Sequence, residues 1–251
     1  MGKRKICKIV FVILSIFLCV AFYELLGICV AYKKQPEVSN TTKKETKNGS
    51  WNECSENTER AVIIEKNPEA LLQRVRLIKN AKKEIILSTF AFQSDESGKL
   101  ILGALHDAAD RGVHIRLLVD GMESWIDMEG NPYFYGLSSH ENVEIKLYNK
   151  ANPLKPWKMM GRMHDKYLIA DGKRYILGGR NTYNYFLGDF PGHKNYDRDV
   201  LVVCDEPEKE NSVNQLLEYF ETIWEQEDSG YFHDNKKLAN RKSVKNAVLE
   251  L

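Results

Sequence analysis

Residues 162–181 have the pattern of a strand, a tight turn and a returning strand, and this pattern constrains the fold more than any other part of the chain. Residues 167–170, Tyr-Leu-Ile-Ala, are apolar and favour an extended backbone. Asp171 and Gly172 follow directly and are a strong signal for a hairpin turn. Residues 174–177 then read as the second strand. The chain is therefore expected to contain a β-sheet that includes this hairpin.

Polar side chains are predicted at the open end of the hairpin. His164 and Lys166 are two residues apart, so in an extended segment their side chains lie on the same face. The returning strand ends at Gly178 and Gly179, and Asn181 then comes back toward His164. An imidazole can attack phosphorus or move a proton near neutral pH, and an ammonium can hold a phosphoryl oxygen. The arrangement indicates a site for a phosphate ester.

The spaced polar residues resemble the HKD motif of the phospholipase D superfamily. The stretch from about residue 60 to residue 224 is similar to the first half of bacterial cardiolipin synthases and related phosphatidyltransferases. This resemblance implies an α/β fold, a phospholipase D-like α-β-α sandwich with a central mixed sheet. The matching residues are His164, Lys166, Asp171, Gly178, Gly179 and Asn181, together with the runs 109–120 and 197–200.

The resemblance also implies a mechanism. One histidine attacks the phosphodiester to form a phosphohistidine, a second histidine protonates the leaving alcohol, and water or another alcohol then accepts the phosphoryl group. His164 is expected to be the nucleophile or the general acid. The other implied roles are charge stabilisation by Lys166 and Asn181, orientation of the imidazole by Asp199 or, as the alternative, Asp197, and a more structural part for Asp171.

Positive charge is concentrated around the motif. Between residues 150 and 180, eight Lys and Arg residues accompany only two acidic ones, Asp165 and Asp171, which favours attraction of a phosphate. Arg162 and Arg180 are candidates for direct phosphate contact, with an ordinary surface role as the alternative. Outside the N-terminal segment acidic residues outnumber basic ones, which argues against a general nucleic-acid surface. Neither a metal nor a cofactor is expected, because no cysteine or carboxylate cluster has ligand spacing.

The chain carries one copy of the motif. It has six histidines, and His164 alone combines the His-x-Lys spacing with the later Asp and Asn. The implied mechanism needs two histidines, so three explanations stay open: a homodimer in which each chain supplies one, as in single-motif nucleases of the superfamily; a separate chain with a second motif; or a truncated, inactive half. A symmetric dimer would place both motifs at one interface. His193 is a weaker candidate for the second acid.

The N-terminal segment is expected to be a membrane anchor. Residues 1–8 are basic, and residues 9–32 are apolar apart from Glu24 and long enough to cross a hydrocarbon core of about 30 Å. A cleaved signal peptide, with secretion of the remaining chain, is the alternative. The basic start favours a single-pass protein with an extracytoplasmic domain. Residues 33–59 are polar and aperiodic and are predicted to be a flexible linker.

Helices and strands alternate after the linker, which predicts an α/β domain. The domain is expected over residues 60–228 and is followed by a basic C-terminal tail, residues 229–251, that is solvated or contacts anionic lipid or a partner. The expected elements are a helix from residue 67, strands at 84–92, 113–119, 143–148 and 200–204, and helices at 98–111 and 208–226.

The expected function is a phospholipase D-type phosphodiesterase or phosphatidyltransferase that acts on phospholipids at a membrane, by hydrolysis or by cardiolipin-type transfer. Two alternatives stay open. One is a single-motif nuclease that acts on DNA or RNA by the same chemistry, and only this alternative gives the protein a nucleic-acid partner. The other is a non-catalytic or truncated half-enzyme that needs a partner chain.

Overall fold

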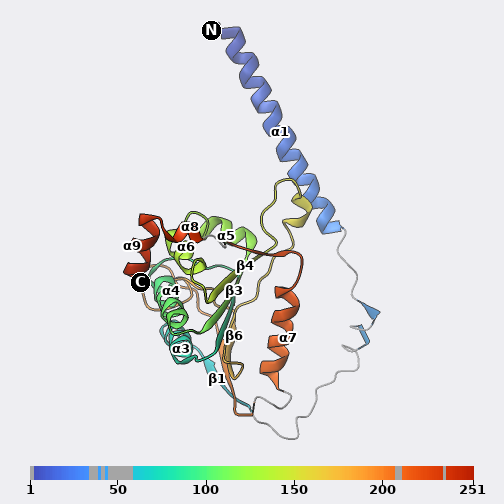
Figure 1. Ribbon diagram of the computed structural model, residues 1–251. Helices are drawn as coiled ribbons and strands as arrows, with labels where there is room; N and C mark the ends of the chain where they lie inside the picture. The colour runs from blue at the N-terminus through green and yellow to red at the C-terminus, as the bar shows by residue number, and fades with distance from the viewer. Residues whose placement is uncertain (1–2, 34–38, 41–42, 45–58, 207–210, 234–235) are drawn as a thin grey trace. The chain divides into compact units, whose positions relative to one another are not determined.

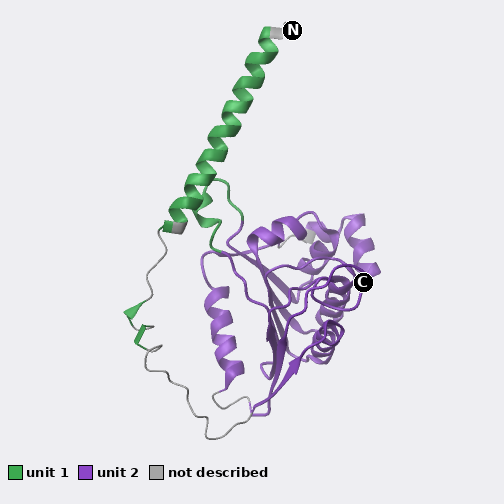
Figure 2. Cartoon of the chain, turned by 180° about the vertical axis from the view of Figure 1, so that it is seen from behind, with its two compact units in different colours: residues 1–56, 151–161 green, residues 57–150, 162–251 purple. Residues whose placement is uncertain are grey.

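The computed structural model describes residues 3–33, 39–40, 43–44, 59–206, 211–233 and 236–251 (Figure 1). The chain forms two compact units (Figure 2). Unit 1 consists of residues 1–56 and 151–161, and unit 2 of residues 57–150 and 162–251. Most of the predicted linker, residues 33–59, lies outside the described residues.

Unit 2 is built on one mixed β-sheet. Its described strands are β1 (Glu59–Ile64), β2 (Glu84–Thr89), β3 (His114–Asp120), β4 (Val143–Tyr148), β5 (Tyr167–Ala170), β6 (Arg174–Gly178), β7 (Asp199–Cys204) and β8 (Ser229–Tyr231). They are ordered β1-β7-β6-β5-β2-β3-β4-β8 across the sheet. The β2–β3 and β3–β4 pairs are parallel, and the other neighbours are antiparallel. The parallel pairs require crossover connections, which here contain helices.

Helices cover both faces of the sheet. The described helices of unit 2 are α3 (Asn67–Asn80), α4 (Glu96–Asp110), α5 (Gly121–Asp127), α6 (Pro132–Ser138), α7 (Ser212–Trp224), α8 (Lys236–Ala239) and α9 (Lys242–Glu250). Figure 1 shows α7 on one face and α3 and α4 on the opposite face. Side chains alternate between the faces: in β2, Ile85 and Leu87 join the core of α3, α4 and α6, whereas Ile86 joins the core of α7. The predicted α-β-α sandwich with a mixed sheet is confirmed.

The C-terminal residues belong to the folded domain. Residues beyond the predicted division at residue 228 pack on the sheet and helices of unit 2: β8 pairs antiparallel with β4, and α9 packs against α6. Gly136 in α6 permits the close packing, since a Cβ atom there would lie 2.5 Å from Cγ2 of Val248. Val244 and Ala247 of α9 are also buried. A few apolar residues in this basic segment are therefore enough to hold it on the core.

Two strand ends differ from the prediction. β2 ends at Thr89 rather than at residue 92, and β5 begins at Tyr167, so His164 and Lys166 lie in the irregular segment that leads into the strand. The pairing between these two strands stops at Ser88 and Tyr167. Both segments leave the sheet at the same end, and the motif residues lie at that end.

The N-terminal apolar stretch forms one long helix, α1 (Lys3–Lys33), which extends the predicted span of residues 9–32 at both ends. Its segment Arg4–Ala31 is long and apolar enough to cross a membrane. The large apolar side chains along it are exposed, from Ile6 to Val30. The protein therefore has an N-terminal apolar helix of the kind found in membrane anchors and signal sequences.

Candidate active site

The β5–β6 hairpin forms as predicted. Asp171 and Gly172 have positive φ angles of 54° and 61°, and the Lys173 N–H donates to the Ala170 carbonyl at 3.1 Å. Positive φ at both central residues is the turn geometry that suits the twist of a two-residue hairpin. The Asp171 carboxylate also accepts hydrogen bonds from three backbone N–H groups of residues 82–84, at 2.7–3.1 Å. Asp171 thus fastens the turn to the segment before β2, at the end of β5 away from the motif histidine.

Three basic side chains gather around one aromatic ring at the other end of β5. The His164 imidazole lies edge-on to Phe90, with ring centroids 4.6 Å apart. Arg162 Cζ and Lys166 Nζ lie 5.0 and 5.2 Å from the Phe90 centroid. Lys166 Nζ also donates to the His164 carbonyl at 2.6 Å. The side chains of His164 and Lys166 share one face of the chain, as predicted, although the segment precedes the strand.

Burial shifts the pKa values of both motif residues. Desolvation, together with the nearby Lys166 ammonium, lowers the pKa of His164 below its ordinary value of 6.5, so its imidazole is mainly neutral at pH 7. Desolvation also lowers the pKa of Lys166 to about 8, against the opposing attraction of Asp165 and Asp197. Lys166 is only 5% exposed, whereas His164 is exposed. An accessible neutral imidazole therefore lies beside a poorly hydrated cation that an anion would stabilise.

Asn181 is brought to the same end of the sheet, as predicted. The Thr182 N–H donates to the Ala91 carbonyl at 3.0 Å, which ties the segment after β6 to the segment after β2. The Asn181 Oδ1 atom accepts from the Ala91 N–H at 3.4 Å. The Asn181 amide therefore lies against the backbone that directly follows Phe90, the residue whose ring His164 contacts.

Asp199 belongs to a buried ion-pair network. Its Oδ2 atom accepts from Nη1 of Arg74 at 2.8 Å and lies 3.2 Å from Nη1 of Arg180. All three side chains are almost completely buried. The Asp199 Oδ1 atom is buried and has no hydrogen-bond partner among the described residues. It lies against the backbone of Gly178, where any side chain would clash with it.

Arg180 is a structural residue in this network. Its guanidinium is fully buried, and its donors are used by the Asn67 side chain and by backbone carbonyls of the protein, those of Ile64, Glu65 and Asp197. A phosphate contact by Arg180, as predicted from the sequence, would require the enclosed guanidinium to leave these partners.

Arg162 is held by two carboxylates. Its Nε atom donates to Asp120 at 2.9 Å, and its Nη2 atom donates to Glu123 at 2.9 Å. Asp120 lies at the end of β3, is 1% exposed and also accepts from the Met163 N–H at 3.1 Å. A phosphate contact by Arg162, as predicted from the sequence, would require these ion pairs to break. Asp120 instead positions the backbone directly before His164.

The sequence does not single out three residues that shape this site. Phe90 lies within the predicted strand at 84–92 and has the appearance of a core residue. Asp120 ends the run 109–120 that carries part of the family resemblance, but that run does not indicate a contact with Arg162. Arg74 has the spacing of the buried face of α3, with Leu71 and Ile78, but that spacing does not indicate its partner Asp199. Their roles depend on contacts with segments far away in the chain, so local patterns could not have identified them.

Other histidines have partners elsewhere. The His114 ring contacts Glu144 at 2.9 Å, and the His140 ring contacts Asp110 at 3.1 Å. His193 packs against Tyr185, with ring centroids 5.4 Å apart. The site described in unit 2 therefore contains one histidine, His164.

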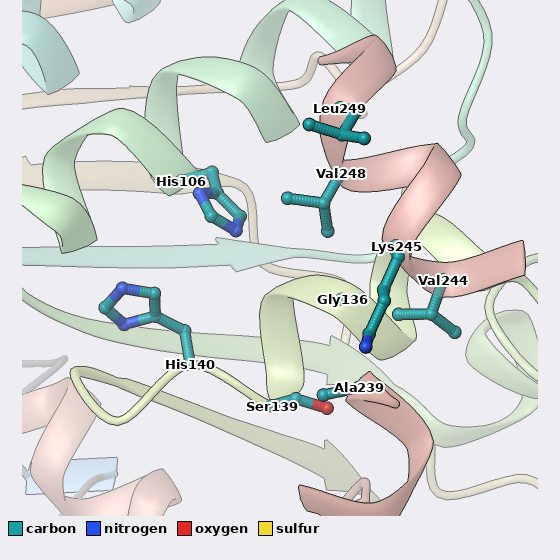
Figure 3. A pocket seen from close by; sticks show the side chains of 9 residues that line it. All are labelled: His106, Gly136, Ser139, His140, Ala239, Val244, Lys245, Val248 and Leu249. Atoms are coloured by element: carbon teal, nitrogen blue, oxygen red, sulfur yellow. The ribbon is translucent and has the colours of Figure 1, made fainter. Parts of the chain in front are cut away.

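A separate hollow of about 450 Å³ lies among α4, α6 and the C-terminal helices (Figure 3). It contains none of the candidate site residues and is not the candidate active site. The hollow is lined by His106, Gly136, Ser139, His140, Ala239, Val244, Lys245, Val248 and Leu249.

Among the described residues, no group of three or more His, Cys, Asp or Glu side chains has the arrangement of a metal site.

The chain is similar in sequence to a known family and to known bacterial proteins. A family model described as "Cardiolipin synthase, PLD-like domain" matches residues 74–224. An uncharacterized protein of Helicobacter pylori (strain J99) is 31% identical over 206 residues, which are 76% of this chain and 38% of that protein. Cardiolipin synthase C of Escherichia coli (strain K12) is 29% identical over 171 residues, 62% of this chain and 34% of that protein. The chain spans about a third of the length of these relatives.

Two solved structures share the fold. Nuc of Salmonella typhimurium, described as a phospholipase D family member, aligns with a TM-score of 0.52 at 18% identity, over 70% of this chain and 99% of that chain. Phosphatidylserine synthase of Haemophilus influenzae aligns with a TM-score of 0.56 at 18% identity, over 76% of this chain and 41% of that chain. The sequence match over residues 74–224 includes the complete hairpin site. The chain belongs to the phospholipase D-like family of the cardiolipin synthase type.

Proposed function

We propose that this protein is a membrane-anchored phosphodiesterase or phosphatidyltransferase that cleaves phospholipids through a phosphohistidine on His164. The observation that carries the proposal is the accessible His164 imidazole, with its lowered pKa, beside the nearly buried Lys166 ammonium around Phe90. A lipid phosphate would compensate the charge of Lys166 while presenting its phosphorus to the imidazole. The family match to cardiolipin synthases supports a phospholipid as the substrate.

The proposed reaction has two displacements. A ring nitrogen of His164 attacks phosphorus, the P–O bond to the leaving alcohol breaks, and that oxygen takes a proton from a second histidine. Water or a lipid alcohol then gives a proton to the second histidine and attacks phosphorus, and the P–N bond breaks. Lys166 and Asn181 stabilise the extra negative charge on the phosphoryl oxygens. Water gives hydrolysis, and a lipid alcohol gives phosphatidyl transfer.

Asp199 is the better candidate to orient an imidazole. Its Oδ1 atom is buried and without a hydrogen-bond partner among the described residues, so it offers an acceptor to a ring N–H. Asp197 Oδ1 already accepts from the Arg198 N–H at 2.7 Å. Asp171 is assigned to the turn, because its carboxylate binds three backbone N–H groups away from the motif histidine.

In this proposal the second histidine comes from a second copy of the chain. The chain aligns with 99% of Nuc and with about a third of E. coli cardiolipin synthase C, and the aligned part contains one copy of the motif. A two-fold interface would bring two His164 side chains to one phosphorus. The rival explanations are a different chain with its own motif and an inactive half.

We also propose that α1 is retained as a single-pass anchor and that unit 2 is extracytoplasmic, because Arg4, Lys5 and Lys8 precede the span.

The test is turnover of phosphatidylglycerol vesicles by the full-length protein in the presence of EDTA, with the oligomer mass measured in the same samples. Hydrolysis or transfer by a dimer supports the proposal. Mixing inactive His164→Ala protein with wild type should lower the activity per wild-type chain, because mixed dimers lack one histidine. An inactive monomer would contradict a self-sufficient enzyme.

A nuclease with the same chemistry is the second candidate. The concentration of Lys and Arg around the motif and the fold likeness to Nuc favour it. A nuclease would prefer DNA or RNA over vesicles, and its binding would weaken steeply with salt. Preference for vesicles in a direct competition would exclude this candidate.

A further inference from the structure

The segment that precedes the motif packs on α1. Residues 151–161, which include a short 3-10 helix, η1 (Pro156–Lys158), form one compact unit with the N-terminal residues (Figure 2). The Tyr23 hydroxyl donates to the Leu154 carbonyl at 2.9 Å. Gly27 leaves room for the ring of Pro156, because a Cβ atom there would lie 2.5 Å from its Cγ atom. This segment, called here the 151–161 loop, is therefore fitted to the surface of α1.

The contact lies toward one end of the apolar helix. A hydrocarbon core of about 30 Å takes about 20 helical residues, and 20 residues counted from Ile9, the first residue after the basic start, end at Ile28. If α1 spans a bilayer, Gly27 lies at the boundary distant from the N-terminus, and Tyr23 lies about one helical turn inside it. The 151–161 loop would lie at the same level.

The composition of the loop suits a lipid interface. Leu154, Trp157 and Met160 are 79%, 45% and 53% exposed, although all three are large and apolar. Lys155 and Lys158 are exposed between them. Apolar side chains enter the boundary between head groups and acyl chains, and neighbouring lysines are attracted to anionic lipid phosphates. The helix that would cross the bilayer contacts this loop at the Leu154 carbonyl, the Pro156 ring and the Trp157 backbone.

We propose that the 151–161 loop is a second membrane contact, which inserts Leu154, Trp157 and Met160 into the interface of an anionic bilayer. This inference rests on the proposed retention of α1 as a membrane span. Gly161 and His164 are three residues apart, so an extended backbone places them at most about 11 Å from each other. Insertion of the loop would therefore keep the reactive histidine close to the lipid phosphates.

Quenching of tryptophan fluorescence by brominated lipids tests the loop. Full-length protein is reconstituted in vesicles of phosphatidylcholine and phosphatidylglycerol, with bromine on the acyl chains close to the glycerol. Trp157→Phe should remove most of the bromine-dependent loss of intensity. Trp224→Phe is the control, because Trp224 is 4% exposed in the core of α7 and its removal should leave that loss unchanged. Equal quenching in wild type and Trp157→Phe would overturn the proposal.

Substitution of the two loop lysines, Lys155 and Lys158, provides a second test of the proposal. Lys155→Gln/Lys158→Gln should weaken the quenching in phosphatidylglycerol vesicles and should make it insensitive to salt, because the attraction to lipid phosphates is lost. Lys82→Gln/Lys83→Gln, a pair of exposed lysines in unit 2, is the matched control and should behave as wild type. Identical salt dependence in both double variants would contradict a role for the loop lysines.

Two further measurements distinguish a failure of the loop contact from a failure of the proposed function. Intact mass and resistance to alkaline carbonate extraction report whether α1 is retained. A chain cleaved after α1 would overturn both the anchor and the loop contact, whereas a retained chain without quenching at Trp157 would overturn the loop contact alone. Turnover of a water-soluble phosphodiester by the same wild-type preparation reports the chemistry of His164 independently of the membrane.

Discussion

The two ends of β5 differ in how their polar groups are compensated. At the turn, the Asp171 carboxylate accepts hydrogen bonds from three backbone N–H groups, those of residues 82–84 at the start of β2. At the motif, desolvation lowers the pKa of Lys166 to about 8, and His164 lies exposed beside an aromatic ring. One end of a four-residue strand is thus stabilised by the protein itself, and the other retains charge that an anion would compensate. A single sequence motif contains both a structural part and a reactive part.

The buried arginines Arg74 and Arg180, which pair with Asp199, belong with the structural part. They lie under the motif, yet the Arg180 guanidinium has no exposure. The charged residues of the motif region thus fall into two groups: those paired within the fold, and those that we expect to contact a substrate. The following substitutions test this division.

His164→Ala should cause the largest effect. We expect turnover to fall by about 10³-fold or more, because the nucleophile is lost, with little change in the free energy of unfolding, because the side chain is exposed. Vesicle turnover and urea denaturation of the same samples check both points. His193→Ala is the control and should retain turnover. Substantial residual activity in His164→Ala would remove this histidine from the chemistry.

Arg180→Met should destabilise the fold by about 3–5 kcal/mol, because it leaves the buried Asp199 carboxylate with less compensation. The KM of the remaining folded enzyme should stay close to that of wild type. Arg198→Met is the control: its ion pair with Glu65 is exposed, and its loss should cost less than about 1 kcal/mol. Unchanged stability with a raised KM would restore Arg180 as a phosphate ligand.

Asp171→Ala should lower the free energy of unfolding by about 1–3 kcal/mol, because backbone N–H groups of residues 82–84 lose their acceptor. Turnover per folded molecule should be retained. Urea midpoints measured beside Asp189→Ala, a change at an exposed acid, check the expectation. A loss of turnover without a loss of stability would place Asp171 in the reaction instead.

The pH dependence should sharpen the contrast at the motif end. We expect kcat/KM to rise as His164 loses its proton below pH 6.5 and to fall about tenfold per pH unit well above pH 8, as Lys166 loses its charge. Lys166→Arg should shift the alkaline fall to higher pH, since arginine stays charged. An unchanged alkaline limb in this variant would assign the limb to another group.

Stability provides a separate check on Lys166. Its pKa is about 8 in the folded protein and near 10.5 when unfolded, so the unfolded chain binds more protons between these values. The free energy of unfolding should therefore rise with pH from about 8 to 10.5, and Lys166→Met should diminish that rise. A slope equal to that of wild type would mean that burial does not perturb this lysine.

Local patterns were sufficient to predict most regular elements. Adjacent residues signal three features that the structure contains: the start of α3 at Asn67-Pro68, the strand β4, and the turn at Asp171-Gly172. The sequence did not predict β1, β8 or α9. These depend on partners far away in the chain: β1 on β7, β8 on β4, and α9 on the bare backbone of Gly136 in α6.

The sequence by itself determined which candidate residues meet, because the spacing of His164, Lys166 and Asn181 around a hairpin brings all three to one end of the sheet. Only the tertiary structure decided which charges are available. Arg180 is enclosed by Asp199 and backbone carbonyls, and Arg162 is paired with Asp120. Burial and ion pairing arise between distant segments, such as those of Arg74 and Asp199, which are 125 residues apart, and no local pattern encodes them.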